Sequence, residues 1–428
     1  MRDAPAPTTI DPEPFVDGLC RARERTLALV GDICEADLER VHSPLMSPLA
    51  WDLGHIAAFE DLWLLHRFAG EPMERPDLAE VYDAFETPRA RRGNLPFLRA
   101  GQAPGYLERV RERALSAIRR LGVDDGMLHE LVVRHEHQHC ETMLQTINLA
   151  RLDGHRPSRE PTPSGSGGGG LDMVEVAGGE LELGADDAGF AYDNERPRHS
   201  VEVAPFLIGR TPIDNASFLA FVEGGGYRRR ELWWEEAWRW KEQYDITHPL
   251  NWTDDGREWR IGGYEPIDPD KPVVHISWFE ADAFARAHGA RLPTEAEWER
   301  AATWDQAAGE TLRFPWGDEP PGPSHANLDQ LAFGTAQVGA YPEGASPSGC
   351  LGMLGDVWEW TSSHFVGYPG FVAHPYREYS EVFFGSDYRV LRGGSWATAR
   401  RVATPTFRNW DLPRRRQIFT GLRIARDA

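Results

Sequence analysis

The chain has 428 residues, a formal net charge of −21 and 41% hydrophobic residues. This length favours two domains with sizeable cores, and the negative charge argues against nucleic acid or an anionic membrane as a partner. No stretch reaches the apolar length of a membrane span, and the first residues lack a signal-peptide pattern. The four cysteines have no paired spacing, so we expect reduced thiols and a cytoplasmic protein.

The first informative segment begins at Ser47. Ser47 followed by Pro48 is typical of a helix start, with a capping residue and then proline in the first helical position. An apolar stripe follows, which consists of Leu49, Leu53, Ile56 and Trp63. His55 lies beside this stripe, and Asp52, one turn earlier, is expected as an outer partner of its imidazole. Alone, such a histidine is more often a packed or capping residue.

Two later segments also have helical periodicity. In the first, the apolar residues at steps of three and four are Leu107, Val110, Ala114, Ile118 and Leu121. In the second, which begins at Met127, one stripe consists of Leu128, Leu131, His135, His139 and Thr142. The stripe should face a core, whereas His137 points elsewhere. We therefore predict a bundle of four helices over residues 12–153, in which inward side chains can form a metal site.

His135 and His139 lie four residues apart on that stripe, so their imidazoles can hold one metal ion. The alternative is a pair of core histidines with satisfied hydrogen bonds. His55 supplies a third candidate ligand, which favours a facial site with open positions. Such a site suits catalytic zinc or non-haem Fe(II), although iron more often takes two histidines and a carboxylate. Glu136 and Glu141 are near, but neither lies four residues from a ligand histidine.

After the predicted bundle the amino-acid composition changes. Residues 154–170 are rich in proline, glycine and serine, which predicts a flexible linker. Alternating strands are predicted at 173–176 and 180–183, and helices at 215–221, 278–288 and 294–302, the last capped by Thr294 and Glu297. Long loops dominate the rest of a second domain over 171–428, and such loops usually carry binding or catalysis.

Several motifs of this second domain carry a family resemblance. Arg291–Glu299, Phe314–Gly317, Gly355–Trp360 and Leu391–Trp396, closed by Gly421–Arg423, resemble the C-type-lectin-like domain of formylglycine-generating enzymes, also called sulfatase-modifying factors. The first domain resembles the DinB family of metal-binding bundles. The implied fold class is α+β.

The two domains in this order resemble the sulfoxide synthases of ergothioneine biosynthesis. The actinobacterial type is the most similar, through Ser47–Leu53, Tyr82–Glu86 and Phe407–Asp411.

The resemblance implies an oxidoreductase that acts on small molecules. In this family Fe(II) and O₂ join the sulfur of γ-glutamylcysteine to C2 of the imidazole of hercynine, Nα-trimethylhistidine, and oxidise the sulfur to a sulfoxide. The implied iron ligands are His55, His135 and His139. A facial set of three ligands leaves three positions on iron, which is room for thiolate, imidazole and O₂.

Other site residues follow from the same resemblance. Gln138, Asn409 and Trp410 correspond to contacts of hercynine, and a tryptophan face suits its quaternary ammonium group. The residues that correspond to contacts of γ-glutamylcysteine are Arg89, Arg92, Asp411 and Arg415. Its carboxylates suit arginine forks and its amino group suits a carboxylate. The alternative for the arginine run is a solvated basic face, which fits Arg91 better than its neighbours.

Tyr376 corresponds to the active-site tyrosine of the family, and Tyr379 is its rival at this register. A phenol near iron can donate a proton or a hydrogen atom to oxygen. Three alternatives stay open at this point: the same chemistry with cysteine or a selenium donor, a zinc-dependent thiol transferase or hydrolase on the bundle, and a non-catalytic glycan-binding or partner-binding module.

Overall fold

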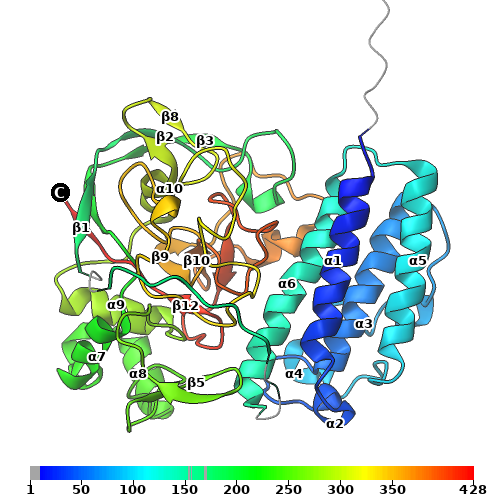
Figure 1. Ribbon diagram of the computed structural model, residues 1–428, viewed down its shortest axis with the longest axis horizontal. Helices are drawn as coiled ribbons and strands as arrows, with labels where there is room; N and C mark the ends of the chain where they lie inside the picture. Colours follow the sequence, from blue (N-terminus) through cyan, green and yellow to red (C-terminus); the bar gives the residue numbers. More distant parts are fainter. Residues whose placement is uncertain (1–9, 153–154, 156, 168–170) are drawn as a thin grey trace, which may run out of the picture. The chain divides into compact units, whose positions relative to one another are not determined.

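The computed structural model describes residues 10–152, 155, 157–167 and 171–428. Contacts divide the chain into two compact units, Met1–His155 and Arg156–Ala428. The first unit is helical, and the second combines short strands, helices and long loops (Figure 1). Among the described residues, no helix combines the length and the apolar character that a membrane crossing requires. The predicted α+β class, a helical bundle followed by a lectin-like domain, is confirmed.

Four long helices build the first unit (Figure 1): α1 (Glu13–Val30), α3 (Leu49–Glu60), α5 (Ala103–Leu121) and α6 (Met127–Ala150). Helix α1 packs on α6, and α3 packs on both α5 and α6. A π-helix, η1 (Asp61–Phe68), continues α3. The short elements are α2 (Glu35–Glu39), the 3₁₀ turn η2 (Pro76–Leu78) and α4 (Arg89–Arg92).

The predicted helices form, and their starts and stripes need three corrections. In α6 only Leu131 and His135 of the predicted stripe are buried, whereas Leu128, His139 and Thr142 are half-buried and His137 is buried as well. Helix α3 begins at Leu49, so Pro48 is its capping residue and makes no side-chain cap bond. The Ser47 hydroxyl instead accepts a hydrogen bond from Arg92 Nη1, 2.8 Å away. In α5 the predicted stripe is buried except for Leu121, which ends the helix and is 52% exposed because Gly122 turns the chain away.

A buried ion network ties the four long helices together. Arg23 of α1 binds Glu60 of α3 at 2.9 Å and Glu136 of α6 at 2.8 Å. Arg111 of α5 binds the same two carboxylates at 2.6 and 2.7 Å. Burial by itself raises the pKa of Glu136, but the two arginines outweigh it and hold that pKa at about 2. The Glu136 carboxylate is therefore occupied by ion pairs that hold the helices together. Loss of either arginine would leave a buried, unbalanced charge and destabilise the fold.

The strands of the second unit form several small sheets. In one sheet β10 (Arg389–Arg392) lies between β11 (Asn409–Asp411) and β9 (Trp358–His364), and β12 (Thr420–Gly421) runs parallel to β9. In another, β4 (Phe206–Gly209) lies between β1 (Met173–Val176) and β13 (Ala425–Asp427). The remaining pairs are β2 (Gly179–Leu183) with β3 (His199–Val203), β5 (Arg257–Arg260) with β6 (Gly263–Pro266), and β7 (Trp304–Asp305) with β8 (Glu310–Thr311).

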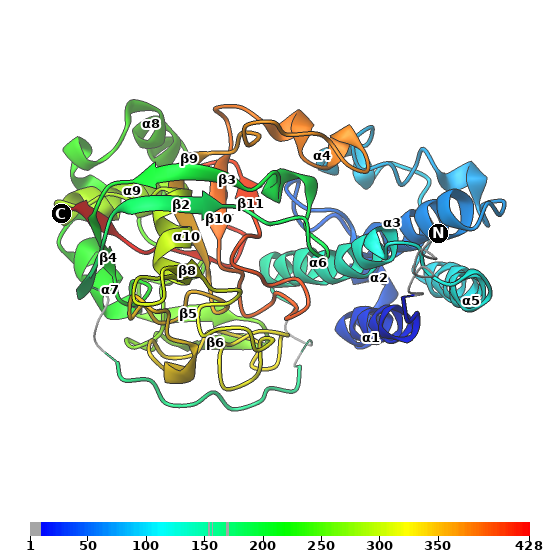
Figure 2. The same ribbon diagram turned by 90° about the horizontal axis from the view of Figure 1, so that it is seen from above.

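Four helices accompany these sheets: α7 (Asn215–Glu223), α8 (Glu235–Gln243), α9 (Trp278–Ala287) and α10 (Glu295–Thr303). The predicted capping of α10 is confirmed, because the Thr294 hydroxyl accepts from Glu297 N and the Glu297 carboxylate accepts from Thr294 N. Helix α10 packs against the β2–β3 pair, which runs as two adjacent strands in Figure 2. Helix α8 was not predicted.

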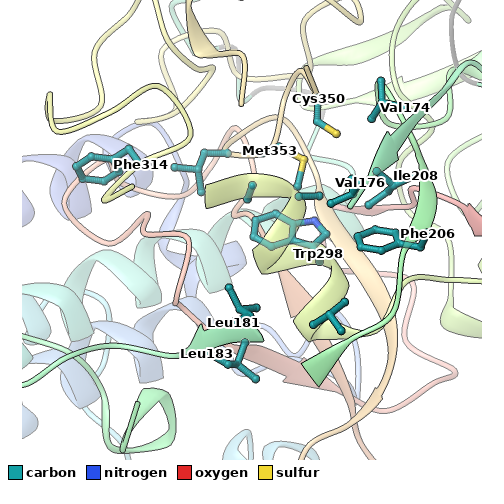
Figure 3. Packing of buried hydrophobic residues seen from close by; sticks show 14 of the residues in the cluster. Val174, Val176, Leu181, Leu183, Phe206, Ile208, Trp298, Phe314, Cys350 and Met353 are labelled. Atoms are coloured by element: carbon teal, nitrogen blue, oxygen red, sulfur yellow. The ribbon is translucent and has the colours of Figure 1, made fainter. Parts of the chain in front are cut away.

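The core of the second unit surrounds Trp298 of α10, which is fully buried among residues of β1, β2 and β4 (Figure 3). The Trp298 indole N–H donates to Glu359 Oε2 at 2.8 Å, and Arg423 donates to both oxygens of the same carboxylate at 3.0 and 2.9 Å. Three sequence motifs that lie far apart in the chain thus meet at one buried carboxylate. These residues hold the framework rather than perform chemistry.

The described part of the predicted linker has no regular secondary structure, yet it is hydrogen-bonded to the second unit. Glu160 N donates to Leu331 O at 2.8 Å, and Gly165 N donates to Gln337 Oε1 at 3.1 Å. Residues 153, 154, 156 and 168–170 of that region lie outside the described part of the chain.

Candidate functional site

The three predicted histidine ligands converge in the first unit. His55 comes from α3, and His135 and His139 come from successive turns of α6. One ligand atom from each lies within 4.8 Å of the others, and the Nε2 atoms of His55 and His135 are 3.2 Å apart. The ring centroids are separated by 4.5 to 5.0 Å.

Packing around the cluster fixes two of the rings. His55 Nδ1 lies 2.7 Å from the carbonyl oxygen of Tyr82, and Trp51 stacks on the His55 ring with centroids 4.9 Å apart. Phe59 stacks on His135 at 3.6 Å. Helix α3 carries Gly54 where Tyr82 approaches, and a Cβ at Gly54 would overlap the Tyr82 hydroxyl. The absent side chain is therefore what lets Tyr82 reach the helix that carries His55.

Burial first, and next the electrostatic interaction with the neighbouring His139 ring, hold the pKa values of His55 and His135 well below the usual value. Both imidazoles are therefore neutral at physiological pH, and a metal binds only the neutral ring through a free nitrogen lone pair.

Asp52 does not lie against His55 as predicted. Its carboxylate oxygen lies 3.5 Å from Nδ1 of His139, because Nδ1 of His55 already faces the Tyr82 carbonyl. Asp52 is fully buried, and within the described part of the chain neither its oxygens nor His139 Nδ1 has a hydrogen-bond partner. If a cation were bound through Nε2 of His139, the ring hydrogen would be held on Nδ1, the nitrogen that faces the Asp52 carboxylate. The donor set therefore fits a bound cation.

The predicted arginines of the first unit differ in environment. Arg92 is buried, donates to Thr87 O at 2.9 Å and Ala84 O at 3.0 Å, and lies 3.8 Å from the centre of the Trp51 ring. Burial lowers the pKa of Arg92 to about 10. Arg89 is half-buried and Arg91 is exposed, as the sequence suggested for Arg91. Gln138 is half-buried on α6 beside His139.

In the second unit Trp410 of strand β11, one of the predicted residues, lies in an aromatic cluster. Trp410 stacks on Phe365 with ring centroids 4.2 Å apart and packs against Phe383 at 5.5 Å. The edge of Tyr379 meets Trp410 at 6.1 Å, and Tyr376 meets Tyr379 at 6.2 Å.

The polar residues of the same strand are half-buried. Asn409 Oδ1 accepts the hydrogen bond of Trp410 N at 2.9 Å. Arg415 Nε lies 3.5 Å from Asp411 Oδ1, so two residues that were predicted separately as thiol-substrate contacts lie beside each other. Five of the predicted residues, Tyr376, Asn409, Trp410, Asp411 and Arg415, thus belong to the second unit, and the histidines, Arg89, Arg92 and Gln138 belong to the first.

Two family models match the chain. Residues 19–143 match the DinB superfamily, and residues 161–428 match the sulfatase-modifying factor enzyme 1-like domain. Curated relatives match almost the whole length. A hercynine oxygenase from Mycolicibacterium thermoresistibile is 49% identical over 96% of this chain and 94% of its own. Hercynine oxygenases from Mycolicibacterium smegmatis and Mycobacterium tuberculosis are each 47% identical over 97% of this chain and 99% of their own.

The chain belongs to the hercynine oxygenase family. It is therefore an enzyme and an oxidoreductase, as predicted. The hydrolase, transferase and purely binding alternatives find no support in this membership.

Residue patterns alone missed several neighbours of the site. Trp51 lies within the Ser47–Leu53 motif, but the sequence pattern gave it no role of its own. Phe59 lies between Ile56 and Trp63 of the predicted apolar stripe and was not singled out. Tyr192, which stacks on Tyr379 at 4.8 Å, lies almost two hundred residues away in the chain. A run of aromatic and acidic residues, Phe190–Glu195, was the only local signal for it.

Proposed function

We propose that this enzyme joins the sulfur of γ-glutamylcysteine to C2 of the hercynine imidazole and oxidises that sulfur to a sulfoxide, in ergothioneine biosynthesis. The observation that carries the proposal is the convergent His55, His135 and His139 cluster in a chain 47–49% identical to hercynine oxygenases. The reaction balances without an external reductant. A thiol S–H and an imidazole C–H are lost, a C–S bond and an S–O bond form, and the second oxygen atom of O₂ leaves as water.

The proposed cofactor is Fe(II), held by His55, His135 and His139. When bound, Fe(II) supplies the redox chemistry with O₂ that Zn²⁺ lacks. The Tyr82 carbonyl and the Asp52 carboxylate lie beside the outer nitrogens of His55 and His139, so they orient these rings. Phe59 and Trp51 restrict ring rotation by stacking.

The substrate contacts are proposals from the family resemblance. For hercynine they are Gln138, Asn409 and Trp410, and the indole face of Trp410 suits a trimethylammonium group. For γ-glutamylcysteine they are Arg89, Arg92, Asp411 and Arg415. Arg92 already donates to backbone and to Ser47, so we expect it to contribute charge and shape more than new hydrogen bonds.

Tyr376 is the proposed proton or hydrogen-atom donor, and Tyr379 is its rival. Both phenols are half-buried at the aromatic cluster of Trp410. We place the reaction in the cytoplasm, where thiol substrates stay reduced.

The deciding experiment is anaerobic loading with Fe(II), followed by O₂ consumption with hercynine plus either γ-glutamylcysteine or cysteine. The proposal expects O₂ uptake and a hercynyl sulfoxide product only with iron, and faster with γ-glutamylcysteine. Faster turnover with cysteine would reassign the thiol donor. Equal activity of the zinc-loaded enzyme would refute the iron chemistry.

A further inference from the structure

The 3₁₀ turn η3 (Asp193–Glu195) lies against the segment that carries Tyr376 and Tyr379. Asp193 accepts a hydrogen bond from the Ser380 hydroxyl at 2.6 Å through Oδ1, and from His374 N at 3.4 Å through Oδ2. One carboxylate therefore contacts both ends of the short segment 374–380. Asp193 and Ser380 are buried, although Tyr376 and Tyr379 between those ends are half-buried.

The residue before Asp193 contacts the same segment by its ring. Tyr192 stacks on Tyr379 with centroids 4.8 Å apart and rings 7° from parallel. It also packs edge-on against Phe407, 5.3 Å away, which lies just before strand β11. Tyr379 in turn meets Trp410 of that strand. The η3 turn therefore contacts the tyrosine segment and the start of β11 together.

The turn itself is held firmly. Tyr192 N donates to Glu195 Oε1 at 2.8 Å, and the Thr406 hydroxyl donates to Glu195 Oε2 at 2.6 Å. Arg408, fully buried, donates to the Asn194 carbonyl at 2.7 Å and to both oxygens of Glu295 at 2.9 Å. Because the turn is held in this way, the Asp193 carboxylate has a fixed position. Its two hydrogen bonds therefore hold residues 374 and 380 in fixed positions as well.

We propose that Asp193 is a positioning residue, which fixes Tyr376 relative to Trp410 by clamping both ends of segment 374–380. This inference rests on the proposed function, because the consequence of a misplaced Tyr376 is a change in product. The contact from Ser380, at 2.6 Å, is a short charge-assisted hydrogen bond, and the contact from His374 N, at 3.4 Å, is a longer one. Burial raises the pKa of the Asp193 carboxyl, and the bonds from Ser380 and His374 act against that shift. Removing the clamp leaves the tyrosine segment held by ring contacts such as those of Tyr379 with Tyr192 and Trp410, without the two hydrogen bonds at its ends.

The test compares Asp193→Ala and Ser380→Ala with the parent enzyme, all loaded with Fe(II). Asp187→Ala is the matched control, because Asp187 is exposed six residues earlier in the same loop. Amide hydrogen exchange of residues 374–384 measures the clamp without any turnover. The ratio of γ-glutamylcysteine sulfinic acid to hercynyl sulfoxide, measured by mass spectrometry, reports its effect on chemistry.

We expect faster exchange of 374–384 in both variants and a sulfinic acid to sulfoxide ratio roughly threefold to tenfold higher, because small misplacements of a reacting group are costly. Iron content should stay at the parent level, and the control should match the parent in every readout. A merely structural role would lower the melting temperature and total activity without moving the product ratio. If Asp193→Ala fails to fold, Ser380→Ala carries the test, since it removes one hydroxyl only.

Two results would overturn the clamp: unchanged exchange in folded variants, or faster exchange with an unchanged product ratio. If the parent enzyme makes no sulfoxide from hercynine with either thiol, the proposed function fails. The exchange measurement then still decides whether Asp193 holds the segment.

Discussion

Asp52 of helix α3 lies 3.5 Å from His139 of helix α6, so a buried carboxylate of one helix faces the imidazole of the next. The same helix α3 also carries His55. Helix α3 therefore carries one proposed ligand, and its Asp52 faces a second. Outer carboxylates of this kind fix the ring orientation of a ligand histidine and raise its basicity.

Replacing Asp52 by Asn should weaken metal binding roughly tenfold to hundredfold, because the amide keeps the shape but loses the charge that favours a hydrogen on Nδ1. Competition with a chelator for Fe(II) or Co(II) measures the affinity. Asp77→Asn is the control, since Asp77 is an exposed aspartate of the same unit. Equal affinities for the parent and Asp52→Asn would mean that His139 needs no outer partner.

Replacing His139 by Ala should remove most of the bound iron and nearly all turnover, because two imidazoles remain where three converge. Metal analysis after anaerobic loading and gel filtration measures iron, and O₂ uptake measures turnover. His66→Ala is the control, because His66 is exposed in η1 of the same unit. A His139→Ala variant with full iron and full activity would remove the metal site from its proposed place.

The sequence predicted correctly those features that depend on residues close together in the chain. The i, i+4 spacing of His135 and His139 fixed their common face on α6, and the Thr294–Glu297 capping box is complete within four residues. The partner of Asp52 was predicted wrongly for the same reason. Spacing along α3 pointed to His55, whereas the packing of α3 on α6 decides which imidazole the carboxylate meets.

Most of the contacts that the sequence did not predict join residues far apart in the chain. Ser380 meets Asp193 across 187 residues of sequence, and no periodicity encodes such a pair. The spacing of Glu136 argued only against a role as metal ligand, and its partners Arg23 and Arg111, from two other helices, could not be read from the sequence. The family motifs located the loops of the second unit, and only the fold shows that Trp298, Glu359 and Arg423 share one buried site.

Replacing Arg415 by Ala should raise KM for γ-glutamylcysteine roughly tenfold or more. A charge-assisted contact contributes about 1.5–3 kcal/mol, and about 1.4 kcal/mol is a factor of ten. Steady-state kinetics with saturating hercynine measure the effect. Arg414→Ala is the matched neighbour, because Arg414 is exposed whereas Arg415 is half-buried beside Asp411. An equal rise in KM in both variants would show a general loss of positive charge instead of a specific contact.

Asp356 should make stability depend on pH. Burial raises its pKa from 3.8 to about 6, against the hydrogen bonds from Ala336 N and Asn327. A raised pKa means that the folded state holds a proton the unfolded chain releases, so this stability is complete below about pH 4 and is lost as pH rises through about 6.

Asp356→Asn keeps an oxygen for both donors but does not titrate, and asparagine tolerates the positive φ of this position. Relative to the parent, the variant should gain on the order of 3 kcal/mol between about pH 4 and pH 7, which follows from about two pKa units. Urea unfolding across that pH range measures the difference. Asp318→Asn, an exposed aspartate of the same unit, should show no such trend.

Replacing Tyr376 by Phe should change the product more than the rate of O₂ consumption. Iron, a thiolate and O₂ together can oxidise sulfur without attack on imidazole, and a positioned phenol supplies the proton or hydrogen atom that favours the sulfoxide. The variant should bind iron normally and release more γ-glutamylcysteine sulfinic acid and less hercynyl sulfoxide. Tyr379→Phe is the matched comparison, because its ring stacks on Tyr192 and meets Trp410. A changed ratio in Tyr379→Phe alone would transfer the role to Tyr379, and an unchanged ratio in both would reduce the two phenols to packing residues.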